Sequence, residues 1–179
     1  MGILNGIGMN KYLALLAAII ALALAGAAWY AYQIDDGPPA GSTPETTMKT
    51  VRLYYYNPDL DQDDAGNILC SRRGLIPVER EISVTQTPIQ DAIRLLLRGE
   101  LTAAERAEGI TTEFPLPGFS LTGASLRDGA LTLSFEDPQA RTVGGACRTG
   151  ILWFQIETTA KQFPEVQNVR FMPEELFQP

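Results

Sequence analysis

The chain has 179 residues, of which 45% are hydrophobic and 20% are charged, proportions that are typical of a globular protein. Its formal net charge is −7 and it has no cluster of basic residues, which argues against nucleic-acid binding. It contains no histidine, so the usual general base near neutral pH and the commonest metal ligand are missing. We therefore expect no enzyme, with no catalytic residues, no metal and no cofactor.

Residues 12–32 form an uncharged apolar run, YLALLAAIIALALAGAAWYAY. As a helix this run would span about 31 Å, which matches the hydrocarbon core of a bilayer. Lys11 precedes it, so the positive-inside rule places residues 1–11 in the cytoplasm. The alternative is a cleaved signal peptide, because residues 23–25 read Ala-Leu-Ala, like a cleavage site. We favour an uncleaved, single-pass membrane anchor, since the run is longer than the core of a signal peptide.

Residues 33–49 are rich in Pro, Gly, Thr and acidic residues and show no hydrophobic periodicity. Such a composition buries too little apolar surface to offset the entropy of ordering, so it predicts a flexible linker. Residues 50–179 then form one extracytoplasmic domain in this interpretation, held at the cell membrane by the anchor.

The first half of this domain predicts two strands followed by two helices. The strands are residues 51–56 and residues 78–85, which are rich in β-branched and aromatic side chains. A capping box of Thr87 and Gln90 predicts the start of the first helix, and Gly99 predicts its end. One apolar stripe on this helix comprises Ile89, Ala92, Ile93 and Leu96. A second capping box, Thr102 with Glu105, predicts a short helix that ends near Gly109.

The second half predicts a hairpin, a long helix and a last strand. Asp128-Gly129 is a strong two-residue turn signal, and Leu131, Leu133 and Phe135 alternate with polar residues after it. The long helix covers residues 144–163 and the last strand residues 166–172. The order β-β-α-(α)-β-β-α-β predicts an α+β fold, with helices packed against a mostly antiparallel sheet.

The two cysteines, Cys70 and Cys147, are the first candidates for a site. Outside the cytoplasm a pair of cysteines is more often bridged than free. A Cys70–Cys147 disulfide would close a loop of about 77 residues, worth around 4 kcal/mol in the chain-entropy model. The alternative is two separate buried thiols.

Four aspartates, Asp59, Asp61, Asp63 and Asp64, resemble the start of a calcium-binding loop. The match then fails, because the sixth position is Asp64 instead of Gly and the twelfth is Cys70 instead of Glu. We expect a solvated loop; a weak cation site is the alternative.

Other polar groups have similarly ordinary interpretations. The acidic pairs Glu79 with Glu81 and Glu136 with Asp137 predict surface ion pairs and not acid–base catalysis. Residues 144–148, GGACR, open a helix whose N–H groups could bind an anion, but we favour close packing of the helix start.

Two further pairs could bind a partner. Ile151 and Phe154 lie away from the main stripe of the long helix, so they either cover the cysteine-containing loop or form a partner surface. Tyr54 and Tyr56 alternate on a strand and therefore share one face, where an exposed aromatic groove would bind cell-wall glycan or peptide.

Five segments resemble the GerMN domain of sporulation and spore-germination proteins across about residues 50–173: VRLYYYNP, PVEREI, TPIQDAIRLLLRGELTAAERAEG, GASLRDGALTLSF and GGACRTGILWFQIETTAKQFPEVQNVRF. The resemblance implies an α+β domain on membrane-tethered extracytoplasmic proteins. Residues 88–172 are also similar to ring-building modules, which pack side by side and carry no catalytic residues. We therefore expect a non-enzymatic interaction or assembly domain of the cell envelope that binds itself or other envelope proteins, with the glycan- or peptide-binding module as the alternative.

Overall fold

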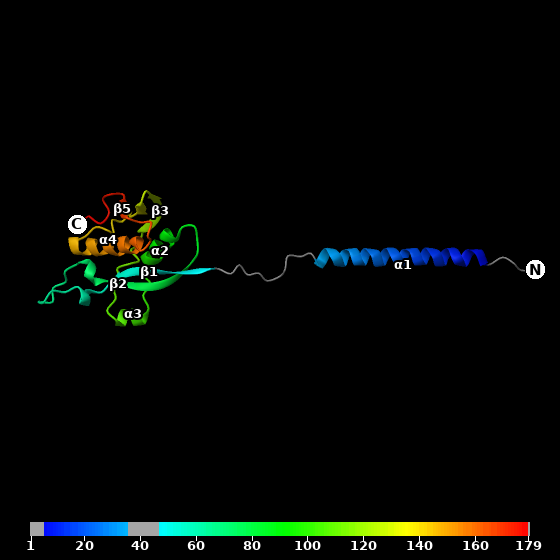
Figure 1. Cartoon of the computed structure of the whole chain (residues 1–179), viewed down its shortest axis with the longest axis horizontal. Coiled ribbons are helices and arrows are strands. Elements are labelled where there is room, and N and C mark those ends of the chain that lie inside the picture. The colour runs from blue at the N-terminus through cyan, green and yellow to red at the C-terminus, as the bar shows by residue number, and fades with distance from the viewer. Residues whose placement is uncertain (1–5, 36–46, 179) are drawn as a thin grey trace, which may run out of the picture. The chain divides into compact units, whose positions relative to one another are not determined.

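A computed structural model of the chain describes residues 6–35 and 47–178, which belong to two separate compact units. The first contains helix α1 (Gly6–Asp35), and the second contains every element from β1 onwards (Figure 1). Within α1, Leu13–Tyr30 has a mean hydropathy of 2.2 and is long and apolar enough to cross a membrane, a criterion that a signal sequence also meets. The greater part of the predicted linker, residues 36–46, lies outside the described residues.

The strands of the second unit, the outer domain, pair into two sheets: β1 (Met48–Tyr56), β2 (Leu75–Ser83), β3 (Ser120–Arg127), β4 (Ala130–Glu136) and β5 (Asn168–Met172). Strands β1 and β2 are antiparallel, as are β3 and β4, whereas β5 runs parallel to β4. The predicted α+β class is confirmed, but the expected single sheet is two sheets. The parallel pair follows from the long helix between β4 and β5, which carries the chain back to the same end of the sheet.

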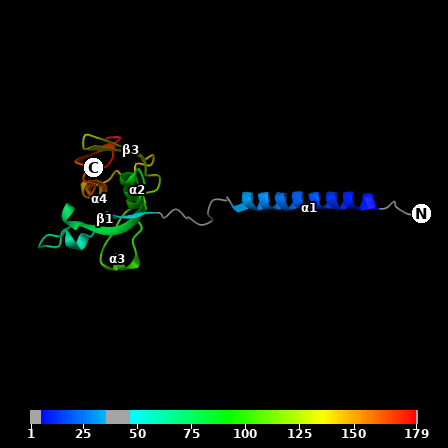
Figure 2. The same cartoon turned by 45° about the vertical axis from the view of Figure 1, so that its right-hand side comes forward.

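Helices α2 (Pro88–Leu97) and α4 (Ala146–Lys161) lie between the two sheets (Figure 2). Helix α4 contacts β1 and β5, and α2 contacts β1 and β3. The shorter helices are α3 (Ala103–Ala107) and the 3-10 turns η1 (Pro58–Leu60) and η2 (Arg72–Gly74). The largest fully buried apolar side chains come from all three layers: Leu53, Tyr55, Ile93, Leu96, Leu131, Leu133, Leu152 and Ile156.

Local turn and cap signals mostly form as predicted. The hairpin turn has positive φ at both Asp128 (49°) and Gly129 (78°), as a type I′ turn requires. The capping box of Thr102 and Glu105 is present in full. The box predicted at Thr87 is wrong: Thr87 is the N-cap residue of α2 but makes no side-chain capping bond. Its hydroxyl donates instead to Oδ2 of Asp91, 3.4 Å away, so a local acid competes for it.

Candidate functional site: the disulfide loop and helix α4

Residues 57–74, which we call the disulfide loop, connect β1 to β2 and extend beyond the ends of both strands (Figure 1). Cys70 in this loop is bonded to Cys147 in the first turn of α4, with 5.1 Å between their Cα atoms. Cys70 has a φ of 54°, a left-handed conformation that is unfavourable for a residue other than glycine. The disulfide therefore joins the second half of the loop to helix α4 of the core.

Asp61 is fully buried at the centre of the loop. Its Oδ2 accepts hydrogen bonds from the Tyr56 hydroxyl at 2.6 Å and the Ser71 N–H at 2.5 Å, and its Oδ1 accepts one from the Ser71 hydroxyl. Burial raises the pKa of Asp61, but these bonds outweigh it and hold the pKa below its ordinary value. The expectation of a solvated loop is therefore wrong for Asp61.

The other aspartates of the run, Asp59, Asp63 and Asp64, are exposed as expected. Asp63 closes a small turn, because its Oδ1 accepts hydrogen bonds from the N–H groups of Ala65 at 2.9 Å and Asn67 at 2.8 Å. Within the part of the chain that the structure describes, no group of three or more Cys, Asp or Glu side chains converges to hold a metal ion. The aspartates instead order the loop backbone.

Arg72 fastens the base of the loop to α4. It forms an ion pair with Glu157, and its guanidinium lies 4.2 Å from the centre of the Phe154 ring. Glu157 also accepts hydrogen bonds from the Trp153 indole at 3.1 Å and pairs with Lys161 at 2.7 Å. Burial of Glu157 raises its pKa, but its bonds to Lys161 and Arg72 outweigh burial and lower it. A charged, fully paired carboxylate thus sits beneath the loop.

The predicted partner-surface residues both lie next to this loop. Phe154 is half-buried under Arg72, which agrees with the interpretation that it covers the loop. Ile151 lines a cavity of about 210 Å³ together with Tyr56 and Pro58. The structure therefore brings Ile151, Phe154, Cys70 and Cys147 into one region.

The exposed aromatic groove predicted from Tyr54 and Tyr56 is not formed. Tyr56 is only 5% exposed, because its ring packs against Gly74, where a Cβ atom would collide with it, and its hydroxyl bonds to Asp61. Burial and the nearby Asp61 carboxylate raise the pKa of Tyr56. Tyr54 is half-buried, and its N–H donates to the Thr159 hydroxyl at 3.0 Å. With Tyr56 buried, this pair therefore does not form an exposed aromatic groove.

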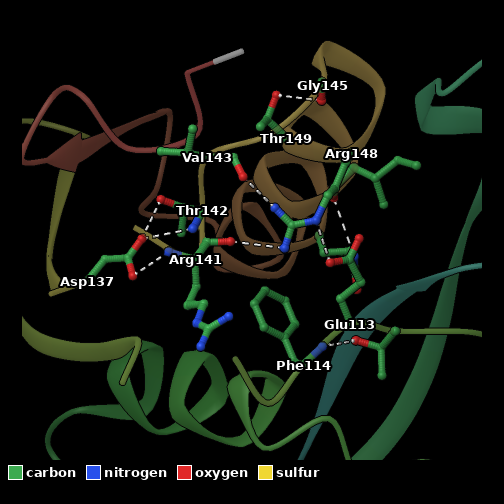
Figure 3. A network of polar contacts seen from close by, with 12 residues as sticks. Glu113, Phe114, Asp137, Arg141, Thr142, Val143, Gly145, Arg148 and Thr149 are labelled. Atoms are coloured by element: carbon green, nitrogen blue, oxygen red, sulfur yellow. Dashed lines mark hydrogen bonds and ion pairs between the residues drawn. The ribbon is translucent and has the colours of Figure 1, made fainter. Parts of the chain in front are cut away.

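The start of α4 is held by Arg148 (Figure 3). Its guanidinium donates to Oε2 of Glu113 at 2.6 Å and to the carbonyls of Val143 and Arg141, each at 2.9 Å. Asp137 orders the same segment by accepting hydrogen bonds from the N–H and hydroxyl of Thr142, both at 2.8 Å. The Arg148 guanidinium beside residues 144–148 is thus engaged within the protein. The expected close packing of this helix start is not seen, however, because Gly145, Ala146 and Cys147 are exposed and the space around Gly145 is open.

Three large aliphatic side chains of the disulfide loop face solvent: Leu60 is 53% exposed, Ile68 is 49% exposed and Leu69 is 45% exposed. These three residues follow no helical or strand period, so hydrophobic periodicity does not single them out. The sequence feature that could have pointed to them is the presence of large aliphatic residues in an aspartate-rich loop, because a solvated loop needs only small polar residues. The loop thus combines a fixed backbone with an apolar and acidic surface.

Comparison with known protein families gives one match. The sequence profile of the Germane family, described as sporulation and spore germination, matches residues 52–175 of the chain. No curated protein sequence matches the chain.

Solved structures that resemble this chain include the following two. The tandem GerMN domains of the sporulation protein GerM from Bacillus subtilis share 20% identity, with a TM-score of 0.49 over 74% of this chain and 41% of that chain. A putative lipoprotein from Clostridium perfringens shares 14% identity, with a TM-score of 0.36 over 75% of this chain and 82% of that chain. The chain thus spans less than half the length of the GerM structure. Because the family model matches more than half of the chain, the chain belongs to the Germane family of sporulation and spore-germination domains, which confirms the resemblance to GerMN.

Proposed function

We propose that the outer domain is a non-enzymatic interaction domain that binds another polypeptide through the disulfide loop. The observation that carries this proposal is a loop that is fixed in three places yet exposes Leu60, Ile68 and Leu69. The fixed places are the disulfide, the hydrogen bonds around Asp61 and the ion pair of Arg72. A loop ordered before binding loses little entropy when a partner docks, which raises affinity.

The charge of the loop defines the chemistry of the partner. The disulfide loop contains four aspartates and two arginines, so it is acidic, and Asp59, Asp63 and Asp64 are exposed beside the aliphatic side chains. A complementary surface has apolar side chains flanked by Lys or Arg. The partner is therefore a polypeptide of that character, either another cell-envelope protein or a second copy of this chain.

The position of the loop in the domain supports this role. The β1–β2 ladder begins with Met48 opposite Ser83 and ends with Tyr56 opposite Leu75. Eight residue steps of about 3.4 Å place the loop roughly 27 Å from Met48, the end that follows α1 in sequence. A domain tethered through Met48 therefore leaves the loop free for docking.

Membrane tethering is part of the proposal. Helix α1 is long and apolar enough to cross a membrane, which supports the proposal that it is an uncleaved anchor whose N-terminus lies in the cytoplasm. A disulfide persists in oxidising compartments outside the cytoplasm, so the pairing of Cys70 with Cys147 supports an extracytoplasmic outer domain. Intact mass measurement of the membrane-extracted protein tests the anchor: retention of residues 1–32 is expected, and a mature chain that starts near residue 26 contradicts it.

Site-specific crosslinking in cells tests the interaction. A photo-reactive amino acid at Leu69 of the full chain should give a discrete adduct with one polypeptide, and the combined substitutions Leu60→Ser and Ile68→Ser should abolish it. The matched control carries the same group at Val84, which is also exposed but lies near the Met48 end of the β1–β2 ladder. Equal adducts from Leu69 and Val84, or no adduct from Leu69, would overturn the proposal.

A further inference from the structure

Strand β2 is an edge strand, because it pairs with β1 on one side only. The N–H of Arg52 bonds away from β2, to a side chain beyond the end of α4, so Val51 is the residue of β1 that bonds to β2, opposite Arg80. The direction of the backbone groups alternates along a strand, so Glu81 and Ser83 direct their N–H and carbonyl groups to the outer edge of β2. Among the described residues, these backbone groups have no hydrogen-bond partner.

Nearer to the disulfide loop, the same edge is closed. Pro77 has no N–H to offer, and the carbonyl of Glu79 accepts a hydrogen bond from the Arg80 guanidinium at 2.9 Å. Both features protect edge strands from pairing with another chain. The open part of the edge therefore begins at Glu81 and ends near Ser83.

A groove of about 380 Å³ lies between this open edge and α2. Ile82 is buried on the sheet face that packs against α2, whereas Glu81 and Ser83 are exposed and point to the opposite face. Residues of both faces line the groove, so the backbone edge between the faces forms its wall. An extended chain in this groove would extend the β1–β2 ladder by one strand.

The helix wall of the groove is cationic. Arg94 and Arg98 are exposed and lie one helical turn apart, so they share one side of α2. Arg98 makes no side-chain hydrogen bond or ion pair among the described residues, and Arg94 lies 3.9 Å from Oδ1 of Asp91, which is long for an ion pair. Asp91 lines the same wall, but its Oδ2 accepts a hydrogen bond from the Thr85 hydroxyl. With two arginines and one acid, the wall keeps a positive charge.

We propose that an extended segment of another polypeptide adds to the open edge of β2 in this groove. Its backbone bonds to Glu81 and Ser83, and acidic side chains at alternate positions lie against Arg94 and Arg98. Alternate side chains of a strand are about 6.8 Å apart and those one helical turn apart are about 5–6 Å apart, so two acids match the two arginines. On its other face, the segment carries Lys or Arg beside the exposed Glu81 side chain.

A second copy of β2 matches this edge less well. Antiparallel pairing of two copies about Glu81 would place this glutamate opposite itself, and like charges directly opposite are destabilising. The site shares no residue with the disulfide loop, so it adds a second surface to the one in the proposed function.

Calorimetric titration of the full chain in an uncharged maltoside detergent tests the proposal. The probe is the peptide acetyl-Val-Lys-Glu-Thr-Glu-Lys-Val-amide, whose palindromic sequence presents both glutamates to α2 in either strand direction. We expect saturable binding that Arg98→Gln weakens at least about fivefold. Arg106→Gln, an exposed arginine on α3, is the matched control and should have no effect. Leu60→Ser should also have no effect, so failure of this site and failure of the loop proposal are distinguishable.

Methylation of the peptide nitrogens tests the strand addition itself. In an antiparallel strand, the residue opposite Glu81 lies on the same face and bonds to it, so an N-methyl group on the central threonine should weaken binding at least about tenfold. N-methyl groups on both glutamates should then be tolerated, and a parallel strand would reverse the two results.

Three outcomes would overturn the proposal: no saturable binding of the parent peptide, equal losses in Arg98→Gln and Arg106→Gln, or equal affinities of the two methylated peptides. Sedimentation of the full chain without peptide tests the other occupant. A dimer that the peptide dissociates would assign the edge to a second copy and overturn the foreign segment, whereas a chain that sediments as a monomer supports it.

Discussion

Replacing the buried Asp61 by asparagine should loosen the disulfide loop. The Asp61 carboxylate accepts three hydrogen bonds, from the Tyr56 hydroxyl and from the N–H and hydroxyl of Ser71. Asparagine keeps one acceptor oxygen, which can retain the two bonds to Oδ2 in a weaker, uncharged form. Its NH₂ group then faces the Ser71 hydroxyl, which can turn to accept. Hydrogen bonds to a charged group are worth about 1–1.5 kcal/mol more than neutral ones, so the loss for two bonds is about 2–3 kcal/mol.

For an outer domain of this size such a loss lowers the melting temperature by roughly 6–12 °C. Circular dichroism melting of the full chain measures this shift, and limited proteolysis should show faster cleavage within residues 57–74. Asp64→Asn is the matched control on the same loop, because Asp64 is exposed and should change stability by less than about 0.5 kcal/mol. If Asp61→Asn and Asp64→Asn melt together, the buried carboxylate does not hold the loop.

The pH dependence of this difference has a defined sign. Because the folded pKa of Asp61 is held below its ordinary value of 3.8, the stability it contributes is fully present above that pH. This contribution is lost as the pH falls below about 4 through the folded pKa, since protonation removes the charge from the acceptor. The gap between wild type and Asp61→Asn should therefore close at low pH.

Four further predictions concern the outer domain. Glu105→Gln should cost about 1–2 kcal/mol at neutral pH, because the negative charge is removed and one of the two 2.8 Å bonds from Arg80 loses its acceptor oxygen. Those bonds lower the pKa of Glu105 from 4.5 to about 2. Thermal melts of wild type and Glu105→Gln at a series of pH values should therefore show their stability difference disappear as the pH falls from 4.5 to about 2, and a difference that does not change with pH would contradict the pairing. Gln162→Ala should expose the free edge of β1, since the Gln162 amide bonds to both the N–H and the carbonyl of Arg52, at 2.8 and 2.7 Å. Light scattering should then show more association than wild type at the same concentration, and equal scattering would contradict this role. Tyr55→Phe should leave the free energy of unfolding in urea unchanged or raise it, because the buried Tyr55 hydroxyl has no hydrogen-bond partner among the described residues; the same burial raises the pKa of Tyr55 to about 12. A decrease of more than about 1 kcal/mol in the free energy of unfolding would show that the hydroxyl has a partner. Reduction of the disulfide should lower the free energy of unfolding by about 3–4 kcal/mol in the same assay, and an unchanged midpoint would rule out a structural role.

The elements that could be predicted from the sequence depend on neighbouring residues. The hairpin at Asp128-Gly129 requires two positive φ angles, and the capping box of Thr102 with Glu105 spans one helical turn. Leu152 and Ile156 lie one turn apart on the long helix, and both are buried, as helical periodicity predicts for one apolar face. In each case the interacting groups lie within a few residues, so local chemistry determines the structure.

The candidate site depended on contacts between distant parts of the chain. Arg72 meets Glu157 across 85 residues, and Tyr54 meets Thr159 across 105 residues. Alternation along β1 placed Tyr54 and Tyr56 on one face, but only the folded loop shows that Tyr56 and Asp61 are buried there together. Sequence periodicity reports which face a side chain occupies, whereas burial depends on which other segment covers that face. The sequence by itself therefore determined the family, the apolar span and the local elements, and only the tertiary structure decided which residues of the loop are buried and which face solvent.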